Sequence, residues 1–178
     1  MTSLVAFTVV VALVGLERLA ELVVSKRNAA WSLARGGVES GQGHYPFMVV
    51  LHSGFLVAML LEAWVRRPDV APALAWSMLA LVVGSQALRW WCITTLGPRW
   101  NTRVIIVPGL APVASGPYRL LPHPNYVAVV VEGVALPLVH GAWITALAFT
   151  VLDAALLTVR IRVENQALAT LPGARVHA

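Results

Sequence analysis

The chain has 178 residues, of which 58% are hydrophobic and only 12% are charged, and its mean hydropathy is +0.76. A soluble domain of this size cannot cover its surface with so few polar side chains, so the composition predicts an integral membrane protein. The single cysteine, Cys92, excludes an internal disulfide, and the five scattered histidines show no zinc-ligand spacing. We therefore expect no metal, and we attribute the formal net charge of +5 to contact with membrane lipid rather than nucleic acid.

Hydrophobic segments predict an all-α fold with five membrane-spanning helices, since about 20 apolar residues are needed to cross a bilayer. The fourth segment is short, and the break from Leu136 to Gly141 predicts a tight hairpin that joins it to the fifth. The charges of the first segment stand at its far end, unlike those of a signal peptide, so we expect it to remain attached. The expected helices cover residues 4–24, 45–65, 71–96, 125–139 and 142–163.

No internal repeat or separate soluble domain is evident, so we treat the chain as one membrane-embedded domain. Its expected parts are three N-terminal helices (1–96), a cytoplasmic loop (97–124), a helical hairpin (125–163) and a C-terminal tail (164–178).

The distribution of basic residues predicts how the chain lies in the membrane. Lys26 is the only lysine among 13 basic residues, which favours a bacterial source. The loops of one side hold only Arg66 and Arg67, so the positive-inside tendency places the N-terminus outside and the C-terminus in the cytoplasm. The opposite side holds nine: Lys26, Arg27, Arg35, Arg99, Arg103, Arg119, Arg160, Arg162 and Arg175.

Two loops on the basic side are longer than connections require. Residues 25–44 mix apolar and basic side chains before a Gly41–Gly43 turn, which predicts a short interfacial helix. This segment either rests on anionic lipid or forms a lid over a lipid substrate. In the loop 97–124, the apolar run 104–107 predicts a β-hairpin arm that covers a cofactor. Candidate substrate contacts near the first loop are Trp31, His44 and His52.

Charged side chains inside membrane spans are costly and usually face the bundle interior, so each is a candidate site residue. In the first helix, Arg18 stands three residues before Glu21 and can pair with it, while Glu17 and Glu21 share one face. These charges either belong to a site or simply neutralise a helix end. Arg89 stands among tryptophans near the end of the third helix, where it either snorkels to the interface or faces a site.

The hairpin adds three more candidates. Glu132 lies two turns into the fourth helix, deep enough that its carboxylate needs a partner. Arg160 and Glu164 lie one turn apart on the fifth helix and face the same way, although a basic helix end also complements the helix dipole.

The junction 116–126 packs polar residues, a glycine and three prolines just before the fourth helix. The prolines forbid a continuous helix, which leaves backbone groups free to bind a ligand. His123 stands between two prolines, so its ring is held in a restricted backbone, and the helix starting at Asn125 offers free amides to an anionic group. Tyr118, Arg119 and Tyr126 supply further donors and rings.

The C-terminal third, from Ser115 to Leu168, resembles the isoprenylcysteine carboxyl methyltransferase family of integral membrane enzymes that use S-adenosylmethionine. The likeness rests on Gly-Pro-Tyr-Arg at 116–119, His-Pro-Asn-Tyr at 123–126, and a helical hairpin that ends in Arg160 and Glu164. The resemblance implies cofactor contacts from Tyr118, Arg119, His123, Asn125, Tyr126 and Glu164, and a substrate or catalytic role for Arg160.

The N-terminal half resembles a bacterial subgroup found beside type III polyketide synthases. The similarity lies in Glu17-Arg18, Lys26-Arg27-Asn28, Trp31 and the run 44–48 with His52. It implies O-methylation of a long-chain alkylpyrone or alkylresorcinol, whereas the wider family implies a prenylcysteine carboxylate.

An acceptor that is already ionised needs mainly alignment, with Arg160 or Arg89 holding the anion. A phenol calls for a base, and the candidates are Glu132, His52 and His44. Two other functions remain open, an NADPH-dependent membrane reductase with a related His-Pro-x-Tyr motif and a non-catalytic membrane subunit.

Overall fold

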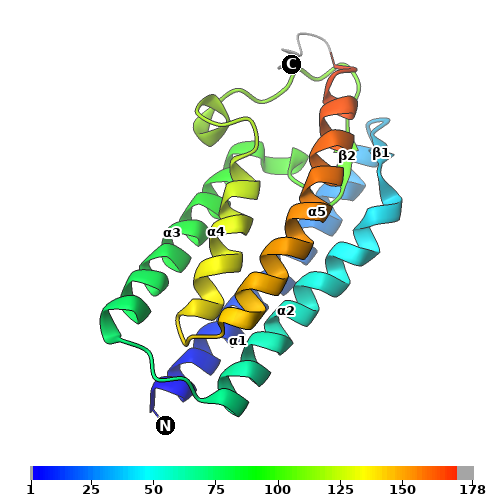
Figure 1. The fold of residues 1–178 in the computed structure, drawn as a ribbon. Helices are drawn as coiled ribbons and strands as arrows, with labels where there is room; N and C mark the ends of the chain where they lie inside the picture. The colour runs from blue at the N-terminus through cyan, green and yellow to red at the C-terminus, as the bar shows by residue number, and fades with distance from the viewer. Residues whose placement is uncertain (1, 172–178) are drawn as a thin grey trace.

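The computed structural model describes residues 2–171, which form a bundle of five α-helices with a small two-stranded ribbon at one end (Figure 1). Three short 3₁₀ turns, η1 (Gln42–His44), η2 (Gly97–Arg99) and η3 (Gly116–Arg119), lie at the same end as the ribbon. The helices are α1 (Thr2–Leu33), α2 (Tyr45–Arg66), α3 (Pro72–Leu96), α4 (Pro124–Leu138) and α5 (Trp143–Leu168).

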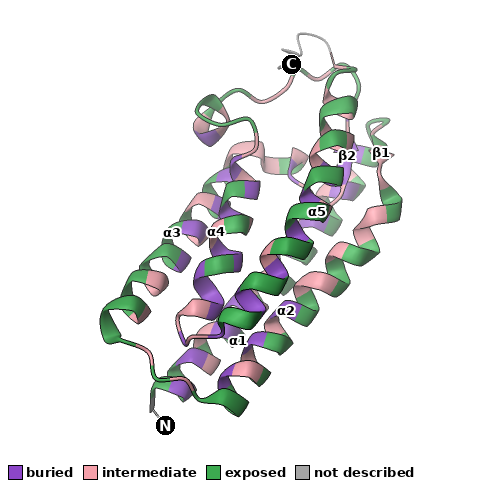
Figure 2. Ribbon diagram, in the orientation of Figure 1, coloured by how far each residue is buried: buried purple, intermediate pink, exposed green. Residues whose placement is uncertain are grey.

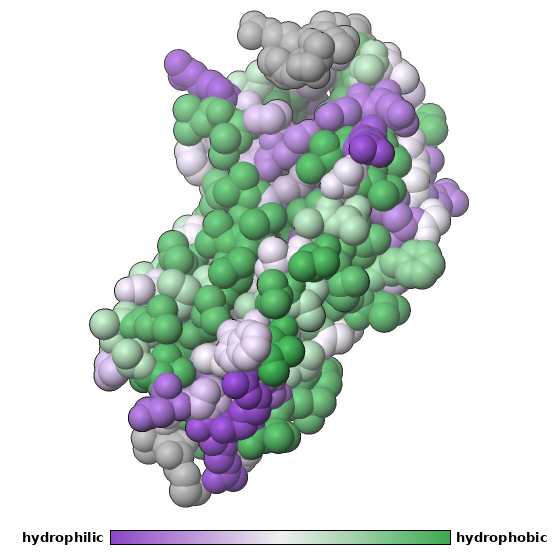
Figure 3. Space-filling view, viewed as in Figure 1, coloured by the Kyte–Doolittle hydropathy of each residue, from purple (hydrophilic) through white to green (hydrophobic). Residues whose placement is uncertain are grey.

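Within the described residues, α1, α2, α3 and α5 are long and apolar enough to cross a membrane, and α4 is a shorter apolar helix. The outward faces of the helices are largely exposed, and Leu13, Val65 and Trp76 are each at least 60% exposed (Figure 2). Hydrophobic residues cover most of the middle of the face in Figure 3, and hydrophilic residues gather toward its two ends. This distribution suits a surface that contacts lipid rather than water, and it confirms the expected all-α membrane fold.

The short helix α4 packs against both α3 and α5. Its buried face includes the small residues Ala128, Gly133 and Ala135, which allow neighbouring helices to approach closely. A side-chain carbon at Gly133 would lie only 2.5 Å from the ring of Phe149 on α5. The apolar core below this contact includes Phe7, Phe55, Met59, Leu136 and Phe149.

The connection between α4 and α5 confirms the expected hairpin. Pro137 lies near the end of α4, and its carbonyl accepts a hydrogen bond from the Ala142 amide at 2.9 Å. Gly141 adopts φ 68°, a left-handed conformation that favours glycine. This turn places the start of α4 beside the end of α5, where the candidate cofactor residues lie.

Two expectations about the loops were wrong. We expected the first helix to stop at residue 24 and a separate interfacial helix to follow. Instead, α1 continues to Leu33 and includes residues 25–33. The run 104–107 forms no hairpin of its own, since β2 (Val104–Ile106) pairs antiparallel with β1 (Val38–Ser40). The two strands satisfy each other's backbone groups across the two loops, a pairing that local patterns cannot reveal.

The loop before β2 is also tied to α1. The Asn28 side-chain amide donates to the carbonyls of Gly97 and Trp100, at 3.1 and 2.8 Å, and Ser25 hydrogen-bonds Thr102. At the other end of the chain, α5 extends to Leu168, so the expected tail from 164 begins inside a helix. Arg175, one of the nine basic residues used to predict the orientation of the chain in the membrane, lies outside the described residues.

Candidate functional site

Five polar side chains from α5 and the start of α4 meet at the ribbon end of the bundle and form what we call the α4–α5 cluster. The Tyr126 hydroxyl donates to the Glu164 carboxylate and accepts a 2.8 Å hydrogen bond from Arg160 Nε. His123 Nε2 lies 2.9 Å from Asn165 Oδ1, and its Nδ1 lies 3.6 Å from Glu164 Oε1. The rings of His123 and Tyr126 stack with centroids 5.2 Å apart.

Local sequence explains why these side chains converge. His123 is held between Pro122 and Pro124 in a non-helical conformation just before α4, and Tyr126 follows in the first helical turn. Arg160 and Glu164 stand four residues apart on α5, which places both on the face turned toward α4. The fold therefore brings these four side chains together, and their roles as cofactor or substrate contacts stay predictions.

The electrostatics of the cluster favour a protonated His123. The Glu164 carboxylate raises the pKa of His123, and Asn165 adds to the effect, while burial acts in the opposite direction. With an acceptor oxygen facing each ring nitrogen, the imidazolium form can donate on both sides.

Asn125 has an unsatisfied polar atom. Its Oδ1 is buried and has no hydrogen-bond partner within residues 2–171. A buried amide oxygen without a donor is costly, so this position suits a ligand that brings an N–H or O–H group. Asn125 immediately precedes Tyr126, so the unsatisfied oxygen belongs to the same helical turn as the cluster.

The two other cofactor candidates of the junction are placed differently. Tyr118 lies in η3, which packs against α3, and burial together with neighbouring Cys92 raises the pKa of its hydroxyl. Arg119 is exposed at the end of η3. Neither residue hydrogen-bonds a member of the α4–α5 cluster in the described structure.

The expected substrate residues His44 and Trp31 also lie at the ribbon end. Gly41 lies close to both the His44 ring and Val163 of α5, one residue before Glu164, and η1 packs against α5. Trp31 near the end of α1 is covered by the Arg35 guanidinium, 4.1 Å from the ring centroid. His44 therefore neighbours the α4–α5 cluster, and Trp31 lies on a different helix.

An apolar groove of about 420 Å³ lies beside the α4–α5 cluster. His123 and Tyr126 line the groove together with apolar residues of the junction and of both helices. These are Leu121, Pro122, Val127, Val130, Val131, Leu157 and Ile161.

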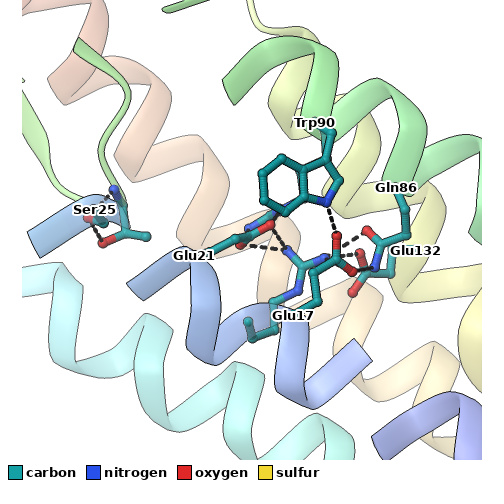
Figure 4. A network of polar contacts seen from close by, with 9 residues as sticks. Glu17, Glu21, Ser25, Gln86, Trp90 and Glu132 are labelled. Atoms are coloured by element: carbon teal, nitrogen blue, oxygen red, sulfur yellow. Dashed lines mark hydrogen bonds and ion pairs between the residues drawn. The ribbon is translucent and has the colours of Figure 1, made fainter. Parts of the chain in front are cut away.

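A second polar group, which we call the charge cluster, joins α1, α3 and α4 deeper in the bundle (Figure 4). Arg89 donates to both oxygens of Glu21, at 2.5 and 2.7 Å, and Arg18 Nη1 donates to the same carboxylate. Arg18 Nη2 also reaches Glu132 Oε2 at 3.1 Å. The cluster is completed by Glu17 and by Gln86 and Trp90, which both donate to the Glu17 carboxylate.

The contacts of the charge cluster show how the charged residues that the sequence analysis singled out in the first, third and fourth helices are paired. Arg18 pairs with Glu21 as expected, and it is also the partner that Glu132 requires. Arg89 is 9% exposed and paired, so it faces the bundle interior rather than snorkelling. Glu132 and Arg89 thus lie together, whereas Arg160 belongs to the α4–α5 cluster.

His52 on α2 stands between the two clusters. Its Nδ1 lies 2.9 Å from the Met48 carbonyl oxygen, and Met48 Sδ lies 3.3 Å from Arg160. His52 also lines a small cavity of about 20 Å³ with Arg18 and Glu132. One side of His52 therefore leads to the α4–α5 cluster, and the other faces the charge cluster.

Three polar residues of the spans were missed by sequence reasoning. Gln86 and Trp90 both donate to Glu17, and their spacing of four residues on the third helix was the available signal. Asp153 is 2% exposed on α5, and its Oδ1 has no partner in the part of the chain that the structure describes. A lone aspartate within an apolar span was the signal for this residue.

A bundle of apolar helices with polar clusters inside it defines a helical integral membrane protein with a buried polar site. The profile of the isoprenylcysteine carboxyl methyltransferase (ICMT) family matches residues 78–170, a stretch that contains the whole α4–α5 cluster. The chain belongs to this family. Membership indicates a membrane methyltransferase that uses S-adenosylmethionine.

Two bacterial relatives match most of the chain. The uncharacterized protein YpbQ of Bacillus subtilis (strain 168) is 35% identical over 163 residues, which cover 91% of this chain and 96% of the relative. An uncharacterized protein of Haemophilus influenzae (strain ATCC 51907 / DSM 11121 / KW20 / Rd) is 25% identical over 156 residues, covering 86% and 90%. No solved structure gave a significant match.

Proposed function

We propose that the protein is an S-adenosylmethionine-dependent O-methyltransferase that acts on a lipophilic acceptor within the membrane. The observation that supports this most is the α4–α5 cluster, which unites His123, Tyr126, Arg160 and Glu164 beside an apolar groove. A polar ligand and a lipid chain would both find complementary surfaces there. Family membership supports the same reaction class.

The residues present fit the methyl donor. When bound, S-adenosylmethionine supplies an electrophilic methyl group on a sulfonium, together with a carboxylate, an ammonium and an adenine. Glu164 and the unsatisfied Asn125 oxygen would accept from the ammonium or the ribose. The His123 imidazolium and the Asn125 backbone amide would bind the carboxylate, since the Tyr126 and Val127 amides donate to the His123 carbonyl. The Tyr126 ring would favour the nearby cation. Tyr118 and Arg119 would close the site from η3.

The acceptor would place its hydrocarbon chain in the groove between α4 and α5. Lipid recognition of this kind relies on apolar contact, and the lining of the groove by Val127, Val130 and Leu157 supplies it. Arg160 is directed at Tyr126 and would hold the accepting oxygen when the acceptor is an ionised carboxylate. The acceptor oxygen belongs either to the hydroxyl of an alkylpyrone or alkylresorcinol lipid or to the carboxylate of a prenylcysteine-like compound.

We place the ribbon end of the bundle, with the α4–α5 cluster, on the cytoplasmic side of a bacterial membrane. The basic loops support this orientation, since Arg35, Arg99 and Arg103 all lie at that end while Arg66 and Arg67 lie at the other. A water-soluble methyl donor made in the cytoplasm would then reach the cluster directly.

Transfer of labelled methyl from S-adenosylmethionine tests the proposal, in membranes containing the protein and with products identified by mass. The acceptors offered are a long-chain alkylresorcinol, a long-chain alkylpyrone and a prenylcysteine analogue. Label in the phenolic lipids alone establishes a hydroxyl acceptor, and label in the prenylcysteine establishes a carboxylate. Label in none, with saturable binding of NADPH instead, would replace the methyltransferase by a reductase. No saturable binding of either compound would leave a non-catalytic subunit.

A further inference from the structure

The charge cluster holds more acidic than basic groups. Its carboxylates come from Glu17, Glu21 and Glu132 (Figure 4), and its guanidinium groups come from Arg18 and Arg89. When every member is ionised, the cluster keeps one negative charge without a guanidinium to balance it. Burial of uncompensated charge in a membrane protein is costly, so the cluster gains stability when it accepts one proton.

The three carboxylates are not equally satisfied. Glu21 receives hydrogen bonds from both Arg18 and Arg89, and Glu17 receives them from Gln86 and Trp90. Glu132 receives a single hydrogen bond from the described residues, to Oε2, and is 8% exposed. A carboxylate that has the fewest donors is the one that binds a proton most readily.

Glu132 also faces space that a polar group can fill. The cavity of about 20 Å³ lies between Glu132, Arg18 and His52, and this volume holds one water-sized group. Arg89 also lines the cavity, and the rest of the lining, which includes Phe55 and Phe149, is apolar. A hydroxyl in this cavity would therefore meet few polar partners apart from Glu132, His52 and the two guanidinium groups.

His52 is prepared to take part in such a contact. Because a carbonyl oxygen only accepts, the 2.9 Å contact with Met48 requires the proton of neutral His52 to lie on Nδ1. Its Nε2 then has a free lone pair for a donor in the cavity. The T-shaped contact with Phe149, 5.3 Å between centroids, holds the ring in place.

From these observations we infer that Glu132 is the general base of the reaction, and that the acceptor is a weakly acidic hydroxyl such as a phenol or an enol. This inference rests on the proposed methyl transfer. The O–H bond of the acceptor breaks and its proton passes to the Glu132 carboxylate, which makes the charge cluster neutral. The oxygen electron pair forms the new O–CH₃ bond, and the C–S bond breaks with its pair left on sulfur as a thioether.

The same charge balance disfavours the alternative acceptor, the carboxylate of a prenylcysteine-like compound. A carboxylate needs no base, and it would bring a second negative charge toward a cluster that already has one in excess. Glu132 lies six residues beyond Tyr126 on α4, about 9 Å along the helix axis, so the acceptor hydroxyl would lie between Glu132 and a donor bound at the α4–α5 cluster. The α4–α5 cluster would thus bind the methyl donor, and the charge cluster would activate the acceptor.

The test compares Glu132→Gln with wild-type protein in detergent micelles. The first probe is a long-chain alkyl nitrophenol without any cofactor, whose absorbance reports whether the bound phenol is ionised. We expect the wild-type protein to bind it as nitrophenolate at a pH at which the probe in empty micelles is neutral, and we expect the variant to lose that signal. Glu62→Gln serves as a matched control, because Glu62 pairs with Arg66 at the opposite end of the bundle.

Turnover supplies the second readout. Glu132→Gln should lower methyl transfer to an alkylresorcinol by about 10²–10⁴-fold, and the loss should shrink at least about tenfold for the more acidic nitrophenol. Affinity for S-adenosylmethionine should stay unchanged. Equal ionisation and turnover in both proteins, or the same loss on both acceptors, would overturn the assignment of the base while the methyltransferase stands. No transfer by the wild-type protein to any acceptor would overturn the proposed function and this inference together.

Discussion

Replacement of Arg89 by methionine tests how much the charge cluster contributes to stability. Arg89 is 9% exposed and Glu21 is 1% exposed, and the guanidinium bonds both carboxylate oxygens. Arg89→Met keeps much of the side-chain volume but leaves Glu21 with Arg18 alone and raises the excess negative charge of the cluster. Removing one partner of a buried pair costs about 3–5 kcal/mol, so we expect a loss of that size.

The assay is equilibrium unfolding in mixed micelles of a mild detergent and dodecyl sulfate. A second variant, Arg89→Met with Glu21→Met, removes both partners of the pair. Its cluster again has one more carboxylate than guanidinium groups, as in the wild type, so it should recover most of the lost stability. Arg67→Met is the control, because Arg67 is exposed at the other end of the bundle and its loss should cost under about 0.5 kcal/mol. Arg89→Met within about 1 kcal/mol of wild type, or no recovery in the double variant, would refute the pairing.

Three further predictions concern the α4–α5 hairpin. Glu164→Ala and His123→Ala should each weaken S-adenosylmethionine binding about 10- to 100-fold by calorimetry, since a hydrogen bond to a charged group contributes about 1.5–3 kcal/mol; unchanged affinity in both would remove this site assignment. Because Glu164 raises the pKa of His123, the stabilisation from that pair should be complete below the unfolded-state pKa of about 6.5 and fade as the pH rises through the higher folded-state value. Thermal unfolding between pH 6 and 9 should show this decline in wild type and a smaller one in His123→Ala, and parallel profiles would contradict it. Gly133→Ala should cost about 1–3 kcal/mol because its new carbon meets the Phe149 ring, whereas Gly54→Ala, in open space, should be neutral or stabilising by up to about 1 kcal/mol; equal stability of the two would show that the contact is not tight.

Much of the α4–α5 cluster could be predicted from the sequence because its geometry depends on short-range rules. Arg160 and Glu164 share a helix face through their spacing, and a tight hairpin necessarily brings the start of one helix beside the end of the next. His123 and Tyr126 stand at that start, so their meeting with Glu164 follows from the chain order.

The charge cluster could be predicted only in part, because it depends on how separate helices rotate against one another. The sequence indicates that Arg18 reaches Glu21, three residues away, but nothing local places Gln86 or Glu132 beside the same guanidinium. The β1–β2 ribbon was missed for the same reason, since its strands are three residues long and belong to different loops. The extension of α1 to Leu33 follows its contacts with η2 and β2, which stabilise a polar helix end that composition alone assigns to a loop.

The ribbon has a consequence for the order in which the protein assembles. Strand β1 is synthesised before α2, whereas β2 follows α3, so the pairing of Val38 with Ile106 cannot form until two intervening helices exist and have returned the chain to the same side. A contact between residues this far apart forms late, after local helices. The ribbon therefore forms only after the first three helices have been inserted. It then connects the loop after α1 to the segment that leads into the junction 116–126, before the α4–α5 hairpin is added.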